Sequence, residues 1–176
     1  ATLGHQFDHV AVWASDNPWK QGQSPIAMRM DMLGLAIADL VTPGTLRLHP
    51  ELRHPYTAVT LERARRLWPT AEFTFVIGAD LVKQLPSWHR SADVMRWANI
   101  LVFPRPGYGL NQVELDELRS HGARVAIATP LSQHHISSST LRQGCPEQPD
   151  EIPAVVQAYI RQHNLYPCPR KPTPPP

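Results

Sequence analysis

Short apolar runs rich in β-branched residues alternate along this chain with longer amphipathic segments, and this alternation limits the possible folds more than any other feature. The candidate strands are residues 8–14, 45–49, 72–78, 99–103 and 124–129. Strands separated by helical patterns are typical of a parallel sheet with helices on both faces. The sequence therefore predicts an α/β fold, a Rossmann-like, doubly wound parallel sheet.

Apolar residues at helical spacing fill the intervals between these strands. They predict helices over residues 26–40, 57–67 and 112–121. A last helix is expected from Pro153, at a first-turn position, to about His163.

The domain organisation follows from where these patterns stop. We expect a single domain over residues 1–166, because 176 residues with 42% hydrophobic content can bury most of their apolar surface in one compact unit, and no internal repeat is visible. The segment 167–176 reads PCPRKPTPPP and cannot pack a core, so it is expected to be a Pro-rich disordered tail.

Charge and cysteine content exclude several classes of partner. Seventeen Lys and Arg against fifteen Asp and Glu give a formal charge of only +2, and no basic stripe interleaved with aromatic residues appears, so no nucleic acid is expected. No apolar run approaches the roughly 20 residues that span a bilayer, so no membrane is expected either. Cys145 and Cys168 give no disulfide framework, and a reducing cytoplasm is the simplest location.

The chemistry of a parallel sheet is expected directly after its strands, because ligands bind outside the carboxyl ends. This rule selects four segments: Ser15 to Lys20, residues 78–80, residues 104–107 and the stretch leading to Ser137. In the last of these, ISSSTLR at 136–142 places hydroxyl groups at a predicted helix start, with Arg142 one turn further on. Such a start binds phosphate well, although an ordinary serine N-cap followed by a solvated arginine is the alternative.

The resemblance to a known family rests on six sequence blocks. TLGH at 2–5 is similar to the (H/T)xGH signature of the nucleotidyltransferase superfamily, and ISSSTLR resembles its ISSTxIR signature. FVIGAD, LPSWHR, VFPRPGY and AYIRQHNLY resemble, in order, blocks of bacterial nicotinate mononucleotide adenylyltransferases, at 75–80, 85–90, 102–108 and 158–166. The resemblance implies an enzyme of NAD biosynthesis that joins nicotinate mononucleotide to the AMP part of ATP and releases pyrophosphate.

The resemblance also implies roles for individual residues. His5, Lys20 and Arg142 would be catalytic and would neutralise charge on the reacting phosphates. ATP would be bound by Thr2, Gly4, Gly78, Asp80, Ser137, Ser138 and Ser139. The pyridine nucleotide would be bound by Thr57, Trp88, His89 and Arg105.

Structural explanations remain open for three of these residues. Trp88 could be a core aromatic, Asp80 could be the N-cap of a helix that begins there, and Arg105 could be a surface arginine. No metal-ligand cluster is visible, so Mg²⁺ is expected to arrive on ATP rather than at a site of its own.

The implied reaction is in-line attack of the mononucleotide 5′-phosphate on the α-phosphorus of ATP. This nucleophile is already an anion, so no general base is required. The sequence leaves open whether the nicotinate or the nicotinamide form is preferred, and also the oligomeric state. Two other functions stay open: a transferase of the same superfamily for phosphopantetheine or a choline-type phosphate, and a nucleotide-binding module without catalysis.

The sequence departs from the family pattern around TLGH. A glycine-rich strand and turn, G(T/S)FDP, should precede it, whereas only Ala1 does. Between His5 and the next strand stand only Gln6 and Phe7, which reach about 7 Å, whereas a parallel crossover needs a dozen or more residues. We therefore expect the central first strand and a crossover helix to be missing on both sides of TLGH, present in the protein but unresolved rather than deleted.

Overall fold

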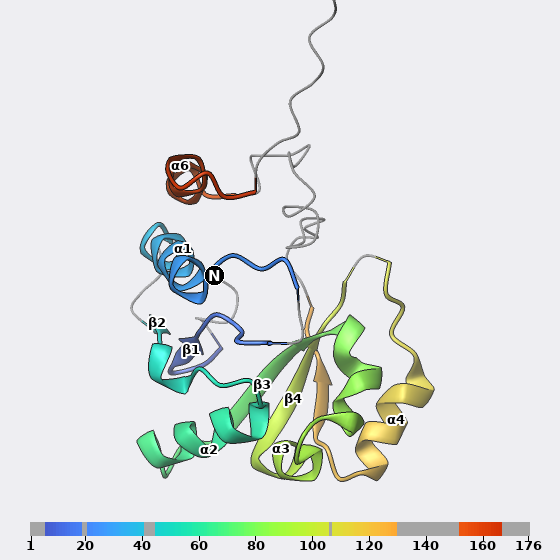
Figure 1. Ribbon diagram of the computed structural model, residues 1–176. Helices are drawn as coiled ribbons and strands as arrows, with labels where there is room; N and C mark the ends of the chain where they lie inside the picture. The colour runs from blue at the N-terminus through green and yellow to red at the C-terminus, as the bar shows by residue number, and fades with distance from the viewer. Residues whose placement is uncertain (1–5, 19–20, 41–44, 106, 130–151, 167–176) are drawn as a thin grey trace, which may run out of the picture.

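The strands of the sheet lie where the sequence predicts them. The computed structural model describes residues 6–18, 21–40, 45–105, 107–129 and 152–166. Its strands are β1 (Val10–Val12), β2 (Leu46–Leu48), β3 (Phe73–Gly78), β4 (Ala98–Phe103) and β5 (Val125–Ile127). Among the described strands every pair is parallel, which confirms the α/β fold with a parallel sheet (Figure 1).

The sheet is divided into two parts. Within the described residues, β1 pairs with β2, while β3, β4 and β5 form a second sheet in that order. The register is Val10↔Leu46 in the first part and Val76↔Leu101 in the second. In Figure 1 the two parts lie side by side, and β1 and β3 are the strands that come nearest to each other. The interruption therefore falls in the middle of the arrangement, where the missing central strand was expected.

Helices and 3₁₀ segments connect the strands. They are α1 (Ile26–Ala38), η2 (Pro50–Leu52), α2 (Thr57–Leu67), η3 (Ala79–Ser87), α3 (Ser91–Trp97), α4 (Gln112–Ser120) and α6 (Ala154–Gln162). The bounds of α2 are those predicted, whereas α3 was not predicted. Pro153 is the N-cap of α6 rather than a first-turn residue. None of the helices in the described ranges is long and apolar enough to cross a membrane.

The main core belongs to the part that contains β3, β4 and β5. All its buried members lie between Ala58 and Ala123, and apart from Ala123 they come from α2, η3, α3, α4, β3 and β4. Leu85, Ile100, Leu115 and Leu118 are fully enclosed there. Each such side chain stabilises the fold by about 1.5–3 kcal/mol through removal from water. This half of the molecule thus supplies a rigid base for the carboxyl ends of β3 and β4.

The other part of the molecule joins segments that are distant in sequence. Helix α6 packs against α1, where the Tyr159 hydroxyl donates a hydrogen bond to Asp31 Oδ2 at 2.8 Å. That hydrogen bond raises the pKa of Tyr159. A second link joins Ser24 Oγ and Tyr166 Oη at 2.7 Å.

The expectation of an unresolved crossover between Gln6 and Phe7 stays a prediction. Gln6 and Phe7 lead straight toward β1, and thus lie toward its amino end. His5 itself lies outside the described residues.

Candidate active site

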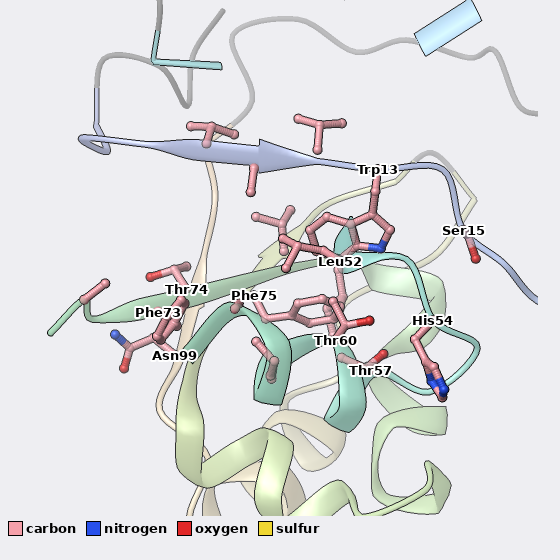
Figure 2. A pocket seen from close by; sticks show the side chains of 18 of the residues that line it. Trp13, Ser15, Leu52, His54, Thr57, Thr60, Phe73, Thr74, Phe75 and Asn99 are labelled. Carbon is pink, nitrogen blue, oxygen red and sulfur yellow. The ribbon is translucent and has the colours of Figure 1, made fainter. Parts of the chain in front are cut away.

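A large cavity lies between the two parts of the sheet and reaches the segments that follow β1 and precede α2. Its volume is about 1210 Å³. Consecutive residues of both facing strands line it, from Phe7 to Trp13 and from Phe73 to Ile77. Figure 2 shows the Trp13 side chain extending from the end of β1 toward Leu52 and Phe75.

Three residues predicted to hold the pyridine nucleotide meet at this cavity. Thr57 is the first residue of α2, and Trp88 and His89 follow η3, yet all three line the same cavity. The His89 ring stacks on Tyr56, with centroids 4.4 Å apart and planes inclined by 32°. The fold therefore brings Thr57, Trp88 and His89 to one cavity, while their role toward the pyridine nucleotide stays a prediction.

Other lining residues were missed by the sequence reasoning. His54 and Tyr56 lie next to Thr57, and the Tyr56 N–H donates to His54 Nδ1 at 3.1 Å. Trp13 lies at the end of β1, before the segment that the strand-end rule selected. Extending that rule by two residues in each direction would have found Trp13. The run of ring side chains HPY before Thr57 is the sequence signal for His54 and Tyr56.

The start of α2 gives this wall a positive partial charge. No side-chain hydrogen bond caps the helix at Tyr56. The N–H groups of Thr57 and Ala58, which open the helix, cannot have partners four residues earlier within it. Such helix starts attract anions, including carboxylates.

Trp88 has a packing role as well as a place in the wall. It packs against the main core and meets Phe75 edge to face, with centroids 6.3 Å apart and planes at 83°. The alternative that Trp88 is a core aromatic is thus partly correct, because one face of the indole is committed to packing.

A second group of predicted residues lies at the carboxyl ends of β3 and β4. Arg105 Nη1 donates to Asp80 Oδ2 at 2.8 Å, and these side chains are 41% and 23% exposed. Asp80 also lies against Gly78, because a Cβ at Gly78 would be 2.4 Å from Asp80 Oδ1. The N-cap of η3 is Gly78, without a side-chain cap, so the alternative of Asp80 as the N-cap is wrong.

This second group is separate from the cavity wall. Gly78, Asp80 and Arg105 are absent from the residues that line the cavity. The structure therefore pairs Arg105, assigned to the pyridine nucleotide, with Asp80, assigned to ATP, and does not join Arg105 to Thr57 and Trp88.

The predicted phosphate-binding residues cannot be placed. His5, Lys20 and Arg142 lie outside the described residues, as do Thr2, Gly4, Ser137, Ser138 and Ser139. Of the segment that leads to Lys20, Ser15 and Asn17 are described, and both line the cavity.

A titratable cluster flanks the cavity near the start of β1. His9 Nε2 and His49 Nε2 are 2.8 Å apart, and His49 Nδ1 lies 2.6 Å from Glu51 Oε1. Desolvation first, and then the charges of His49 and Arg47, lower the pKa of His9. The hydrogen bond with His49 lowers the pKa of Glu51.

Across the described ranges, no group of three His, Cys, Asp or Glu side chains could hold a metal ion. The residues that line the cavity offer aromatic faces, hydroxyls and helix N–H groups, and the Asp80–Arg105 pair offers one carboxylate. That chemistry suits a nucleotide, whose rings need flat apolar surfaces and whose sugar hydroxyls need hydrogen-bond acceptors.

Comparison with known proteins agrees with this chemistry. A probable nicotinate-nucleotide adenylyltransferase of Synechocystis sp. is 35% identical over 177 residues, covering 93% of this chain and 88% of the relative. A protein of the same name from Thermus thermophilus is 30% identical over 159 residues, covering 88% and 81%. No family model matches the chain.

Solved structures share the fold. Two are complexes of the Plasmodium falciparum nicotinic acid mononucleotide adenylyltransferase. The complex with APC superposes with a TM-score of 0.69 at 17% identity, covering 90% of this chain and 82% of that one. The complex with NaAD gives a TM-score of 0.72 at 15% identity, with 93% and 90% coverage.

At 35% identity over 93% of this chain, as found for the Synechocystis sp. relative, the chain belongs to the nicotinate-nucleotide adenylyltransferase family.

Proposed function

We propose that this chain transfers the adenylyl group of ATP to nicotinate mononucleotide, forming the adenine dinucleotide and releasing pyrophosphate. One observation carries the proposal: Thr57, Trp88 and His89, which the sequence assigns to the pyridine nucleotide, line one cavity although they come from different elements. The names of the two relatives agree with this reaction.

The pyridine ring would lie against the aromatic wall of the cavity. The Tyr56–His89 pair and Trp88 offer ring faces, and stacking on such faces contributes about 0.5–1.5 kcal/mol per pair. The Thr57 hydroxyl and the first N–H groups of α2 would receive the ring substituent. A helix start stabilises negative charge, and nicotinate carries a carboxylate where nicotinamide carries a neutral amide. We therefore expect nicotinate mononucleotide to be preferred over nicotinamide mononucleotide.

The adenosine part would lie at the carboxyl ends of β3 and β4. The Asp80 carboxylate can accept hydrogen bonds from ribose hydroxyls, and Arg105 holds one of its oxygens. Gly78 leaves room for that carboxylate, because any side chain there would displace it.

The phosphates would be neutralised by Lys20, Arg142 and the hydroxyl groups of Ser137 and Ser138, as the sequence predicts. Mg²⁺ bound to ATP would add positive charge at the leaving pyrophosphate. The mononucleotide phosphate attacks the α-phosphorus in line, so these residues align the reactants and stabilise charge and need not remove a proton.

Pyrophosphate release tests this proposal. The protein is mixed with ATP and nicotinate mononucleotide, and we expect saturable release of pyrophosphate that requires both substrates. Nicotinamide mononucleotide should give a lower kcat/KM. Phosphopantetheine, the acceptor of the rival transferase, is tested with ATP in place of nicotinate mononucleotide. Pyrophosphate release with phosphopantetheine but not with nicotinate mononucleotide would contradict the proposal.

A nucleotide-binding module without catalysis is favoured by one observation, the interrupted sheet. Calorimetry distinguishes this case, because such a module would bind ATP without releasing pyrophosphate. The cytoplasmic location, the absence of nucleic acid and membrane partners, and the Pro-rich tail stay predictions.

A further inference from the structure

Two loops border the cavity beyond the carboxyl ends of β1 and β2. One connects β1 to α1 and includes Ser15 and Asn17, and the other connects η2 to α2 and includes His54 and Tyr56. Figure 2 shows Ser15 beyond the end of β1 and His54 on the turn that leads to Thr57. The backbone groups of such loops need partners outside regular helices and strands, so the side chains that reach them decide where the loops lie.

Arg63, in the second turn of α2, reaches back to the loop that precedes this helix. Its Nη1 donates hydrogen bonds to Glu51 O at 3.2 Å and to Arg53 O at 2.6 Å. Both carbonyls lie at the end of η2, where the last carbonyls of a helix have no partner within it. The guanidinium therefore ties the end of η2 to the side of α2, at the residue directly before His54.

Arg29, in the first turn of α1, makes the same kind of contact with the other loop. Its Nε donates to Ser24 O at 3.0 Å, and its Nη1 donates to Ser15 O. These two serines lie toward opposite ends of the connection between β1 and α1, so one guanidinium spans it. Gln23 Nε2 donates to Asn17 O at 2.9 Å and closes the same loop further.

An ion pair places the two loops next to each other. Arg53 Nε lies 3.4 Å from Asp16 Oδ2, with the two side chains 40% and 37% exposed. Asp16 follows Ser15, whose carbonyl Arg29 holds, and Arg53 carries a carbonyl that Arg63 holds. The contacts thus form a continuous chain from α1 to α2 through both loops. Because an exposed ion pair contributes little to stability, its main effect is on the relative position of the loops.

We propose that Arg63 and Arg29 are positioning residues for the two substrates. Arg63 fixes the loop that ends at Thr57, the residue assigned to the pyridine mononucleotide. Arg29 fixes the loop whose sequence includes Lys20, which is assigned to the reacting phosphates. Each arginine acts through its loop, and both roles rest on the proposed reaction.

Substitution by methionine tests the proposal, because methionine keeps an apolar stem but has no hydrogen-bond donor. Arg63→Met should raise the KM for nicotinate mononucleotide by about three- to tenfold and change the KM for ATP by less than about twofold. Arg29→Met should instead lower kcat by about tenfold or more, since misplaced phosphate-binding groups slow the transfer. A merely structural role would not separate the two parameters in this way.

Arg66→Met is the matched control. Arg66 is an exposed arginine of α2 that pairs with Glu62 at 3.0 Å on the same helix. This variant should keep the KM and kcat values of the unaltered chain. Arg63→Lys is the conservative variant, because its ammonium carries donors but ends one bond short of the arginine Nη1. It should recover part of the mononucleotide affinity that Arg63→Met loses.

Amide hydrogen exchange, followed by mass spectrometry without substrates, observes the loops directly. Arg63→Met should speed exchange in residues 49–56, because the end of η2 loses its tie to α2. Arg29→Met should speed exchange in residues 13–18 for the same reason. Both variants should keep a Tm close to that of the unaltered chain, and Arg66→Met should leave exchange in both segments unchanged.

Two results would overturn the proposal. One is an equal rise in the KM for both substrates in Arg63→Met, which would indicate a general loss of structure. The other is kinetics and exchange in Arg63→Met and Arg29→Met that match those of Arg66→Met. If the unaltered chain itself releases no pyrophosphate with both substrates present, the proposed reaction fails instead, so the two failures are distinguishable.

Discussion

Arg105 and Asp80 form an ion pair that joins the carboxyl ends of β4 and β3, with Arg105 Nη1 2.8 Å from Asp80 Oδ2. Both side chains keep contact with solvent, so the pair stabilises the fold by only about 0–1 kcal/mol. Its importance lies in orientation, because the arginine fixes the carboxylate that we assign to the ribose.

Asp80→Asn should raise the KM for ATP by about two- to tenfold, the effect of one weakened hydrogen bond. Arg105→Ala should raise the KM for the pyridine mononucleotide if its sequence-based assignment holds. Because the residues touch, the effects on ATP should be less than additive in the double variant. Steady-state kinetics measures all three, and a change of several degrees in Tm would indicate a structural role instead.

Gly78→Ala should weaken ATP binding without a large loss of stability. The new Cβ would lie 2.4 Å from Asp80 Oδ1, so the carboxylate must move away from Arg105. A side-chain end moves at little cost, and the φ of Gly78 is −76°, which alanine adopts easily. Gly109→Ala is the control, because nothing lies within 4 Å of its Cβ. Equal ATP affinity in the two variants would remove Asp80 from the site.

His89→Ala should raise the KM for nicotinate mononucleotide by about two- to tenfold and leave that for ATP nearly unchanged, since one stacking surface is lost. His89 is exposed, so the variant should fold normally. His121→Ala, an exposed histidine after α4, is the matched control. Trp88→Ala is a less selective test because that indole also packs on Phe75, and loss of stability is expected with it.

Arg142→Ala should lower kcat by about a hundredfold or more if the guanidinium stabilises charge on the leaving pyrophosphate. Arg119→Ala removes an arginine from an ion pair on α4 and serves as the control. Stopped-flow and steady-state measurements of kcat for both variants decide the matter. Unchanged turnover in Arg142→Ala would contradict the phosphate assignment.

Stability should decrease as the solution becomes acidic because of His9. The pKa of His9 is lowered in the fold from its ordinary value of 6.5, mainly by desolvation. The folded state therefore binds a proton less readily than the unfolded state, so this contribution is complete above pH 6.5 and is lost as the pH falls through the folded pKa. Urea unfolding between pH 7.5 and about 5 measures the slope. His9→Gln should flatten it, and an unchanged slope would assign the effect to other groups.

The strongly patterned elements could be predicted from the sequence. The apolar runs of β3 and β4 and the spacing in α2 leave little choice of structure. Helix α3 was missed because it has only seven residues and starts after Arg90, whose φ of 54° no sequence pattern reveals. An α-helix beginning at Asp80 was left open as an alternative, but Pro86 stands inside the run and Ala79–Ser87 is a 3₁₀ helix.

The candidate site was predicted unevenly for a similar reason. Thr57, Trp88 and His89 stand in blocks that resemble the family, so their meeting at one wall could be anticipated. The contact between Arg105 and Asp80 depends on how β3 and β4 stand in register, a long-range property that local sequence does not encode. Trp13 was missed because it stands two residues before the segment that the strand-end rule selected, and His54 because the ring-rich run before Thr57 was not considered as a whole.

The distribution of the main core has a consequence for synthesis on the ribosome. Every buried member of that core lies between Ala58 and Ala123, so this half can condense as soon as its own stretch has emerged. The half with β1 and β2 has to wait, because α1 receives its partner α6 only after residues 154–162 have been made. In the nascent chain the part that contains β3, β4 and β5 would thus fold first. The part that contains β1, β2 and α1 would fold last, when α6 packs on α1 and the Tyr159 hydroxyl reaches Asp31.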